Sequence, residues 1–427
     1  MKSDKLALFG GPKLISKPFK RYNPFGLEEV NAAKAVIETG VLSKYLAKWG
    51  DDFLGGPMVK KFEADWERKF NVKHAITVNS WTSGLVCAVG AIGVEPGDEI
   101  ILPPWTMSAT AMAILHWNAI PVFADIDPIT YCIDPISIEK NISSRTKAIM
   151  AVDIGGQSAD MNIINSLAKK YNLKVICDTA QAPGALFEDN YAGTLSDIGG
   201  YSLNYHKHIH TGEGGVLVTN NDDLAKKMRL IRNHAEAVIG DMGYEDLTNM
   251  IGHNFRLGEI ESSIGIEQLK KLDKLIKSRQ NIAKKLDEGL KDLVGLNLPK
   301  TRENCTHVYY MYFMNLDIDK LGGAKRENIF KALDAEGLKG ISLKFANVHL
   351  LPIFQKKQAY GSNGFPWNSS FTRNDITYKK GICPVAESLH DENYLGFQMC
   401  MYEMTDYEID LMILTFKKVW KNLSVLR

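Results

Sequence analysis

The stretch KVICDTAQAPGA, residues 174–185, contains a short apolar run that ends at the carboxylate of Asp178. Short β-branched or apolar runs alternate with helical stretches on both sides of it. The other runs lie at 74–78, 99–103, 120–125, 147–153, 198–203 and 214–220, and the helical stretches include 82–93, 108–118 and 162–172. This alternation predicts an α/β fold with a mostly parallel sheet covered by helices on both faces. Ligands bind such sheets at the carboxyl ends of the strands.

The length of the chain predicts two domains. At 427 residues it is too long for one compact core. A long helical stretch at 258–293 is expected to lead out of the first domain, and a strand pattern at 308–318 and a helical one at 405–423 indicate a smaller α+β domain. We therefore expect a large domain over 1–274, with an N-terminal arm, and a small one over 275–427. The arm reads as turn-rich, with an exposed loop at 38–57.

The composition excludes several classes of protein. Lys+Arg total 51 and Asp+Glu 50, so the net charge of +1 gives no general attraction to nucleic acid or anionic membranes. No apolar run approaches the length of a membrane helix, and the N-terminus lacks the apolar core of a signal peptide. Six scattered cysteines indicate a reducing compartment, so we expect a cytoplasmic protein. His206, His208 and His210 have no partner cluster, and no metal site is expected.

Three polar segments follow predicted strands. Asp178 ends one strand, Ser202 ends another with Lys207 in the next loop, and Thr82 and Ser83 open a helix after a third. Taken singly, each has an ordinary explanation as a helix cap, a solvated charge or a turn. Together they provide a lysine for a Schiff base, a carboxylate for a pyridine nitrogen and a helix N-terminus for a phosphate. This combination predicts pyridoxal 5'-phosphate (PLP) as the cofactor.

These segments also resemble a known family. Together with stretches at 6–14, 95–114, 121–135, 252–269 and 383–389, they are similar to the DegT/DnrJ/EryC1/StrS family of sugar aminotransferases, over nearly the whole chain. DTAQA at 178–182 and KHIHTGEGG at 207–215 are the most specific motifs. The resemblance implies the type I PLP aminotransferase fold, L-glutamate as amino donor, a keto-sugar as acceptor, and a homodimer.

The resemblance assigns roles around the cofactor ring. Lys207 matches the lysine that binds PLP, and its freed amine would be the base that moves the proton. Asp178 matches the carboxylate that pairs with the pyridine nitrogen, and Gln181 matches the side chain that bonds the phenolic oxygen. Met107 stands where many members place an aromatic ring against the cofactor face, and a thioether can pack there.

The resemblance also assigns the phosphate site. Ser202 matches a phosphate-binding hydroxyl, and Thr82 and Ser83 match the phosphate turn. Asn254, in GHNFRL, matches an asparagine that reaches the phosphate from the partner subunit. This implies active sites shared across a dimer and an inactive monomer.

Other departures from the family pattern concern the surroundings of this site. Asp153 and Gly155 stand where His and Tyr are usual, which predicts a roomier pocket of different polarity. Trp81 stands where glycine is typical. We expect none of these departures to touch the lysine or its carboxylate partner, and so to affect the substrate rather than the cofactor.

The overall pattern favours a sugar acid as acceptor. Our specific hypothesis is the 8-oxo acid of 3-deoxy-manno-octulosonate (Kdo), giving the 8-amino-3,8-dideoxy sugar for lipopolysaccharide synthesis. Its carboxylate would need a cation, for which Lys44, Lys48 and Arg256 are candidates. The alternatives are a nucleotide-linked keto-hexose, a cyclitol ketone, or a PLP-binding regulator without catalysis. A dehydratase of this fold is disfavoured by Lys207, and a nucleotide-dependent oxidoreductase by the absence of a GxGxxG turn.

Overall fold

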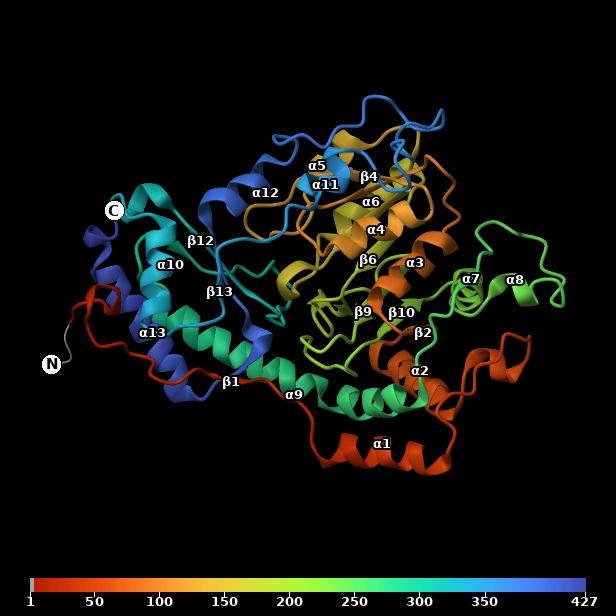
Figure 1. Cartoon of the computed structure of the whole chain (residues 1–427), viewed down its shortest axis with the longest axis horizontal. Coiled ribbons are helices and arrows are strands. Elements are labelled where there is room, and N and C mark those ends of the chain that lie inside the picture. Colours follow the sequence, from red (N-terminus) through yellow and green to blue (C-terminus); the bar gives the residue numbers. More distant parts are fainter. Residues whose placement is uncertain (1–3) are drawn as a thin grey trace.

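Seven strands form the central sheet of the computed structural model, which describes residues 4–427 (Figure 1). Their order is β2-β10-β9-β6-β5-β3-β4, and every neighbouring pair is parallel except the two that involve β10. The strands are β2 (His74–Val78), β3 (Glu99–Leu102), β4 (Ile120–Phe123), β5 (Thr146–Val152), β6 (Lys174–Asp178), β9 (Ile198–Ser202) and β10 (Gly215–Thr219). The predicted α/β class and the predicted strands are confirmed.

Both faces of this sheet are buried, as its apolar runs require. Val216 and Val218 of β10 pack with Phe62 and Trp66 on one face, and Leu217 between them packs into the larger core on the other. The helices of this part are α2 (Pro57–Phe70), α3 (Trp81–Ala91), α4 (Ser108–His116), α5 (Pro135–Asn141), α6 (Met161–Tyr171), α7 (Asp222–Arg232) and α8 (Ala235–Val238). A short hairpin joins β7 (Leu186–Phe187) to β8 (Asn190–Tyr191). The segments that follow β2, β3, β6 and β9 contain Thr82, Met107, Gln181 and Lys207, respectively.

A 32-residue helix, α9 (Glu259–Leu290), connects the sheet to a second core. Leu269 and Leu272 pack beneath the large sheet, whereas Leu286 and Leu290 belong to the second core. The second core is built on an antiparallel sheet of order β11-β12-β14-β13. Its elements are β11 (Leu296–Asn297), β12 (Tyr312–Leu316), β13 (Ile341–Ser342), β14 (Tyr394–Phe397), α10 (Arg326–Ala335) and α13 (Asp406–Lys421). The expected boundary at residue 274 falls inside α9 and stays a prediction.

The chain between β13 and β14 returns to the large core. Val348, Phe354, Trp367 and Tyr378 of this segment pack with the large sheet's core. It contains two short helices, α11 (Pro352–Gln355) and α12 (Pro384–Ser388).

The N-terminal arm is more ordered than its composition indicates. Helix α1 (Leu27–Thr39) lies along α9, where Gln268 Nε2 donates to Glu29 Oε1 at 2.8 Å (Figure 1). Further upstream, β1 (Lys20–Arg21) pairs with β15 (Tyr402–Glu403). The expectation of a turn-rich arm is therefore wrong over α1.

Two further features bear on class. Within residues 4–427 no helix combines the length and apolarity needed to cross a bilayer. All six cysteines are free thiols in the described structure, five of them buried.

Candidate active site

Lys207 lies in the loop between β9 and β10, with only 7% of its side chain surface exposed. Its Nζ sits 4.5 Å from the centre of the Tyr310 ring, and no ion pair holds it within the described residues. Burial lowers the pKa of this amine to about 8, although the negative charge of Asp178 opposes the shift. A fraction of the amine is therefore neutral near physiological pH, as a base or nucleophile requires.

Asp178 ends β6 and accepts hydrogen bonds from two side chains and, at 3.3 Å, from the Ala180 N–H. Trp81 Nε1 donates to its Oδ1 at 2.7 Å, and Thr110 Oγ1 donates to its Oδ2 at 2.8 Å. Burial raises the pKa of this carboxyl, and these two hydrogen bonds oppose that shift. The two side-chain donors come from the first turn of α3 and from α4, so both helices fix the orientation of the carboxylate.

A cavity of about 490 Å³ contains both groups. Six of the eight predicted site residues line it: Lys207, Asp178, Gln181, Ser202, Thr82 and Met107. A cavity of this size can hold a small cofactor together with part of a substrate. Ser83 and Asn254 do not line it.

Ser83 serves the helix rather than the cavity. Its backbone N–H donates to Ser80 Oγ at 3.1 Å, and its own hydroxyl donates to Asn79 Oδ1 at 2.7 Å. The expected place of Ser83 in the phosphate turn stays a prediction. Thr82 next to it is exposed, and the first-turn N–H groups of Trp81 and Thr82 have no acceptor inside the helix.

Asn254 is exposed on the segment before α9. Its carbonyl oxygen accepts from Asn79 Nδ2 at 3.4 Å, which places it beside the turn that precedes α3. Its expected role in a partner subunit's site stays a prediction.

Trp81 corrects one expectation. We expected it to leave the lysine and its carboxylate partner untouched, yet its indole N–H is a direct donor to Asp178. The ring fits because Gly84 and Gly200 have no side chains: a Cβ on Gly200 would lie 2.1 Å from the indole. Two glycines in a buried strand, Gly199 and Gly200, are the sequence signal for such a close approach.

Asp153 and Gly155 do not change the cavity as expected. Asp153 is fully buried, accepts from Ala159 N and Thr179 Oγ1, and is outside the cavity lining. Gly155 has φ +69°, and the space of its missing Cβ is filled by the Phe313 ring 2.6 Å away. No extra room is therefore created. The Gly155 N–H donates to Gln181 Oε1 at 2.8 Å and orients that side chain instead.

The cationic side chains also differ from expectation. Lys44 and Lys48 are exposed and Arg256 Nε donates to Asn233 Oδ1, and none of the three lines the cavity. Lys344, which follows β13, does line it and was not predicted. Tyr310 also lines the cavity and was not predicted as a site residue. Among residues 4–427 no group of three His, Cys, Asp or Glu side chains could hold a metal, and His208 Nε2 bonds to the Val308 carbonyl.

Comparison with known proteins identifies the family of the chain. The model of the DegT/DnrJ/EryC1/StrS aminotransferase family matches residues 44–392. The chain belongs to that family. It is therefore a PLP-dependent aminotransferase.

Similar proteins span most of this DegT/DnrJ/EryC1/StrS member. The spore coat polysaccharide biosynthesis protein SpsC of Bacillus subtilis is 33% identical over 86% of this chain and 92% of its own length. The GDP-perosamine synthase of Caulobacter vibrioides is 36% identical over 75% and 88%. The solved aminotransferase of Psychrobacter cryohalolentis superposes with a TM-score of 0.80 at 27% identity, covering 95% of this chain and all of that one.

The residues present fit PLP. The cofactor needs an amine, an acid for its ring nitrogen and donors for its phosphate. The cavity offers the buried Lys207, the buried Asp178, the Ser202 hydroxyl and the first turn of α3. Asn204 Oδ1 is buried without a partner in the described chain, and this residue lines the same cavity. An orphaned acceptor of this kind is expected where a ligand completes the hydrogen bonds.

Proposed function

We propose that this protein transfers the amino group of L-glutamate to a ketone or aldehyde carbon of a sugar, with Lys207 as the proton-carrying base. The observation that supports this most is the placement of Lys207 and Asp178 in one cavity, with the lysine pKa lowered to about 8. When bound, PLP supplies an electron sink for the carbon that loses its proton.

Lys207, Asp178 and Gln181 each have a separate role in this proposal. Lys207 Nζ takes the proton from the donor carbon and returns it to the acceptor carbon in the reverse half-reaction. Asp178 would hold a negative charge for the ring nitrogen of bound PLP, and Trp81 and Thr110 keep its oxygens in position. Gln181 would bond the phenolic oxygen of the ring through its side-chain NH₂ group, since its acceptor oxygen is held by the Gly155 N–H.

The donor half-reaction tests this proposal without any acceptor. Holoenzyme mixed with L-glutamate should release about one equivalent of 2-oxoglutarate per site while the visible absorbance of the lysine-bound cofactor disappears. Lys207→Ala should release none, whereas Lys339→Ala, a lysine paired with Asp334 on the surface, should behave as wild type. A regulator without catalysis would bind PLP and release nothing. L-Glutamine in the same assay decides between the two donors.

For the acceptor we propose a sugar acid, with the 8-oxo acid of Kdo as the specific hypothesis. A carboxylate needs a cation, and Lys344 lines the cavity and is exposed. The similarity to GDP-perosamine synthase supports the alternative, a nucleotide-linked keto-hexose. Lys344→Gln should raise KM for the 8-oxo acid but leave KM for a neutral keto-cyclitol unchanged. Turnover of GDP-4-keto-6-deoxymannose alone would favour the alternative.

We also propose a homodimer in which Asn254 serves the partner's site. Met107 beside the cavity is 69% exposed and Ile251 near Asn254 is 67% exposed, so both apolar side chains are open to contact with a partner subunit. Co-expression of Lys207→Ala with Asn254→Ala tests this. If the sites are shared, a mixed dimer has one site with both defects and one with neither, so activity returns. If each chain is complete, both parents and the mixture stay equally impaired.

A further inference from the structure

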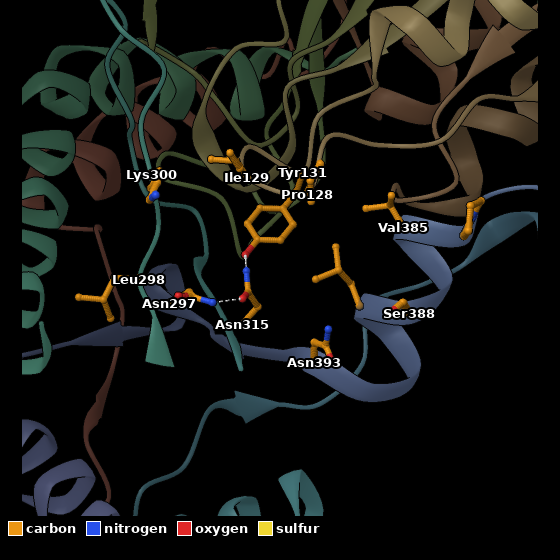
Figure 2. Close-up of a pocket in the computed structure, with 12 residues that line it drawn as sticks. Pro128, Ile129, Tyr131, Asn297, Leu298, Lys300, Asn315, Val385, Ser388 and Asn393 are labelled. Atoms are coloured by element: carbon orange, nitrogen blue, oxygen red, sulfur yellow. Dashed lines mark hydrogen bonds between the residues drawn. The ribbon is translucent and has the colours of Figure 1, made fainter. Parts of the chain in front are cut away.

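A second cavity, of about 530 Å³, shares no lining residue with the active cavity, and Figure 2 shows the residues that line it. Its walls come from three parts of the chain. The loop with Ile129 and Tyr131 follows β4, Asn297 and Asn315 lie on β11 and β12, and Val385 and Ser388 lie on α12. The cavity therefore touches both the large sheet's core and the small sheet, and a molecule bound there would contact both.

The polar atoms of this cavity are only partly used. Asn315 Nδ2 donates to the Tyr131 hydroxyl at 2.9 Å, and Asn297 Nδ2 donates to Asn315 Oδ1 at 2.7 Å (Figure 2). Within residues 4–427 no acceptor is found for the Tyr131 hydroxyl proton. Asn393 Oδ1, also in the lining, is buried with no hydrogen-bond partner in the described chain. Free donors and acceptors at several points suit a ligand with several hydroxyl groups.

The apolar and charged residues of the lining further limit the class of ligand that fits the cavity. Ile129, Leu298, Val385 and Leu389 supply aliphatic surface, which packs against the C–H faces of a sugar. Lys300 is the one cation of the lining, and none of its residues is a carboxylate. A positively charged ligand would therefore find no carboxylate in the lining, whereas a ligand with one negative charge would pair with Lys300.

We propose that this cavity is a second binding site for a polyhydroxylated small molecule with one negative charge, of the sugar-acid class. This inference does not rest on the acceptor proposed above, because the two cavities share no lining residue. The ligand's hydroxyls bond Tyr131, Asn297 and Asn393, and its carboxylate pairs with Lys300.

Stacked rings connect this site to the active cavity. Tyr131 stacks on Trp105 with ring centres 5.7 Å apart and an interplanar angle of 6°. Trp105 in turn lies 5.1 Å from Phe345, which lines the active cavity. Trp105 Nε1 also donates to the Ala386 carbonyl in α12, one wall of the second site. A bound molecule thus touches a side chain only two rings from the active cavity.

Calorimetric titration of the holoenzyme tests the proposal with three probes. D-Gluconate has the hydroxyls and the charge, D-glucose has the hydroxyls alone, and acetate has the charge alone. Gluconate should bind at least about fivefold more tightly than glucose, and acetate should not bind. If neither gluconate nor glucose binds up to about 10 mM, a free energy weaker than about −3 kcal/mol, the proposal is overturned.

Variants place the binding in the second cavity. Ser388→Trp puts a large ring into the cavity from an exposed position of α12 and should weaken gluconate binding at least about tenfold. Lys300→Gln should weaken gluconate binding but leave glucose binding unchanged. The matched control is Lys339→Gln, the same substitution at a surface lysine that pairs with Asp334 outside both cavities, which should change neither.

The outcomes are distinct. Gluconate affinity that survives Ser388→Trp, or that falls in Lys344→Gln but not in Lys300→Gln, locates the molecule in the active cavity and overturns the proposal. If Ser388→Trp lowers Tm by more than about 2 °C, Asn393→Leu takes its place. That substitution removes the unpaired Asn393 Oδ1 and keeps a side chain of nearly the same size, and it too should weaken gluconate binding.

Discussion

Replacing Trp81 by Phe removes one of the two side-chain donors that hold Asp178 and keeps an aromatic ring against Gly84 and Gly200. A hydrogen bond to a charged group contributes about 1.5–3 kcal/mol. Asp178 is only 5% exposed, so bulk water compensates poorly for the lost donor. The ionised carboxylate should therefore be disfavoured by about ten- to a hundredfold relative to the neutral acid.

The assay is the pH dependence of the glutamate half-reaction in a single turnover. Burial already raises the pKa of Asp178, and loss of the Trp81 donor raises this pKa further. The reaction needs the ionised form, so the acid limb of the rate profile moves to higher pH and the rate near neutrality falls. A structural defect alone would lower the rate equally at every pH.

Trp117→Phe is the matched control. Its indole N–H donates to the Val86 carbonyl at 2.8 Å, and the ring is buried outside the active cavity. The same chemical change there should lower the unfolding midpoint and leave the acid limb in place. The reasoning about Trp81 is refuted if its variant binds PLP normally and keeps the wild-type acid limb.

Three further predictions concern stability. The cofactor-free wild type should gain about 3 kcal/mol over Lys207→Met between pH 8 and 10.5, because over that range the folded amine, with its pKa lowered to about 8, is neutral while the unfolded amine still binds a proton. Arg232→Met leaves the buried Glu63 carboxylate without its 2.8 Å partner and should lower the free energy of unfolding by about 3–5 kcal/mol in urea titrations. Gly155→Ala should cost about 1–2 kcal/mol for its positive φ and more for the contact with Phe313, seen as a lower thermal midpoint.

Controls separate these effects from general damage. Arg68→Met breaks an exposed pair with Asp65 and should change the free energy of unfolding by less than about 1 kcal/mol. Gly322→Ala has a similar φ of +60° with nothing near its Cβ position, so it reports the backbone cost alone. Equal losses in the two glycine variants would contradict the steric argument, and a pH-independent difference for Lys207→Met would contradict the lowered pKa.

The strands of the large sheet could be predicted because each is a short apolar run buried on both faces. The chain positions of Lys207 and Asp178 were equally visible, since each follows such a run. Helix α1 was not predicted, because its N-cap is Gly26 and only Glu29 and Val36 are buried on it. Its partner, α9, lies more than 200 residues away in sequence, and such contacts leave no local pattern.

The missed site residues have the same explanation. Trp81 meets Asp178 across 97 positions, and Gly200 in β9 is the sequence feature that fits a large ring packed on that strand. Ser83 was expected at the phosphate because its position in a helix's first turn is right. Whether its hydroxyl faces the cavity or the cap is decided by side-chain rotation, which sequence does not encode. Lys344 lies in an irregular segment where a lysine resembles any solvated charge.

Helix α9 also limits how substrate can enter. At 32 residues it is about 48 Å long and runs without a break from one core into the other. Moving the two cores apart would require α9 to bend. Helices bend sharply only at a proline or a similar defect. Helix α9 contains no proline. We therefore expect substrate to enter through movement of short segments beside the cavity, at 203–214 and 341–347, while the rest of the molecule stays rigid.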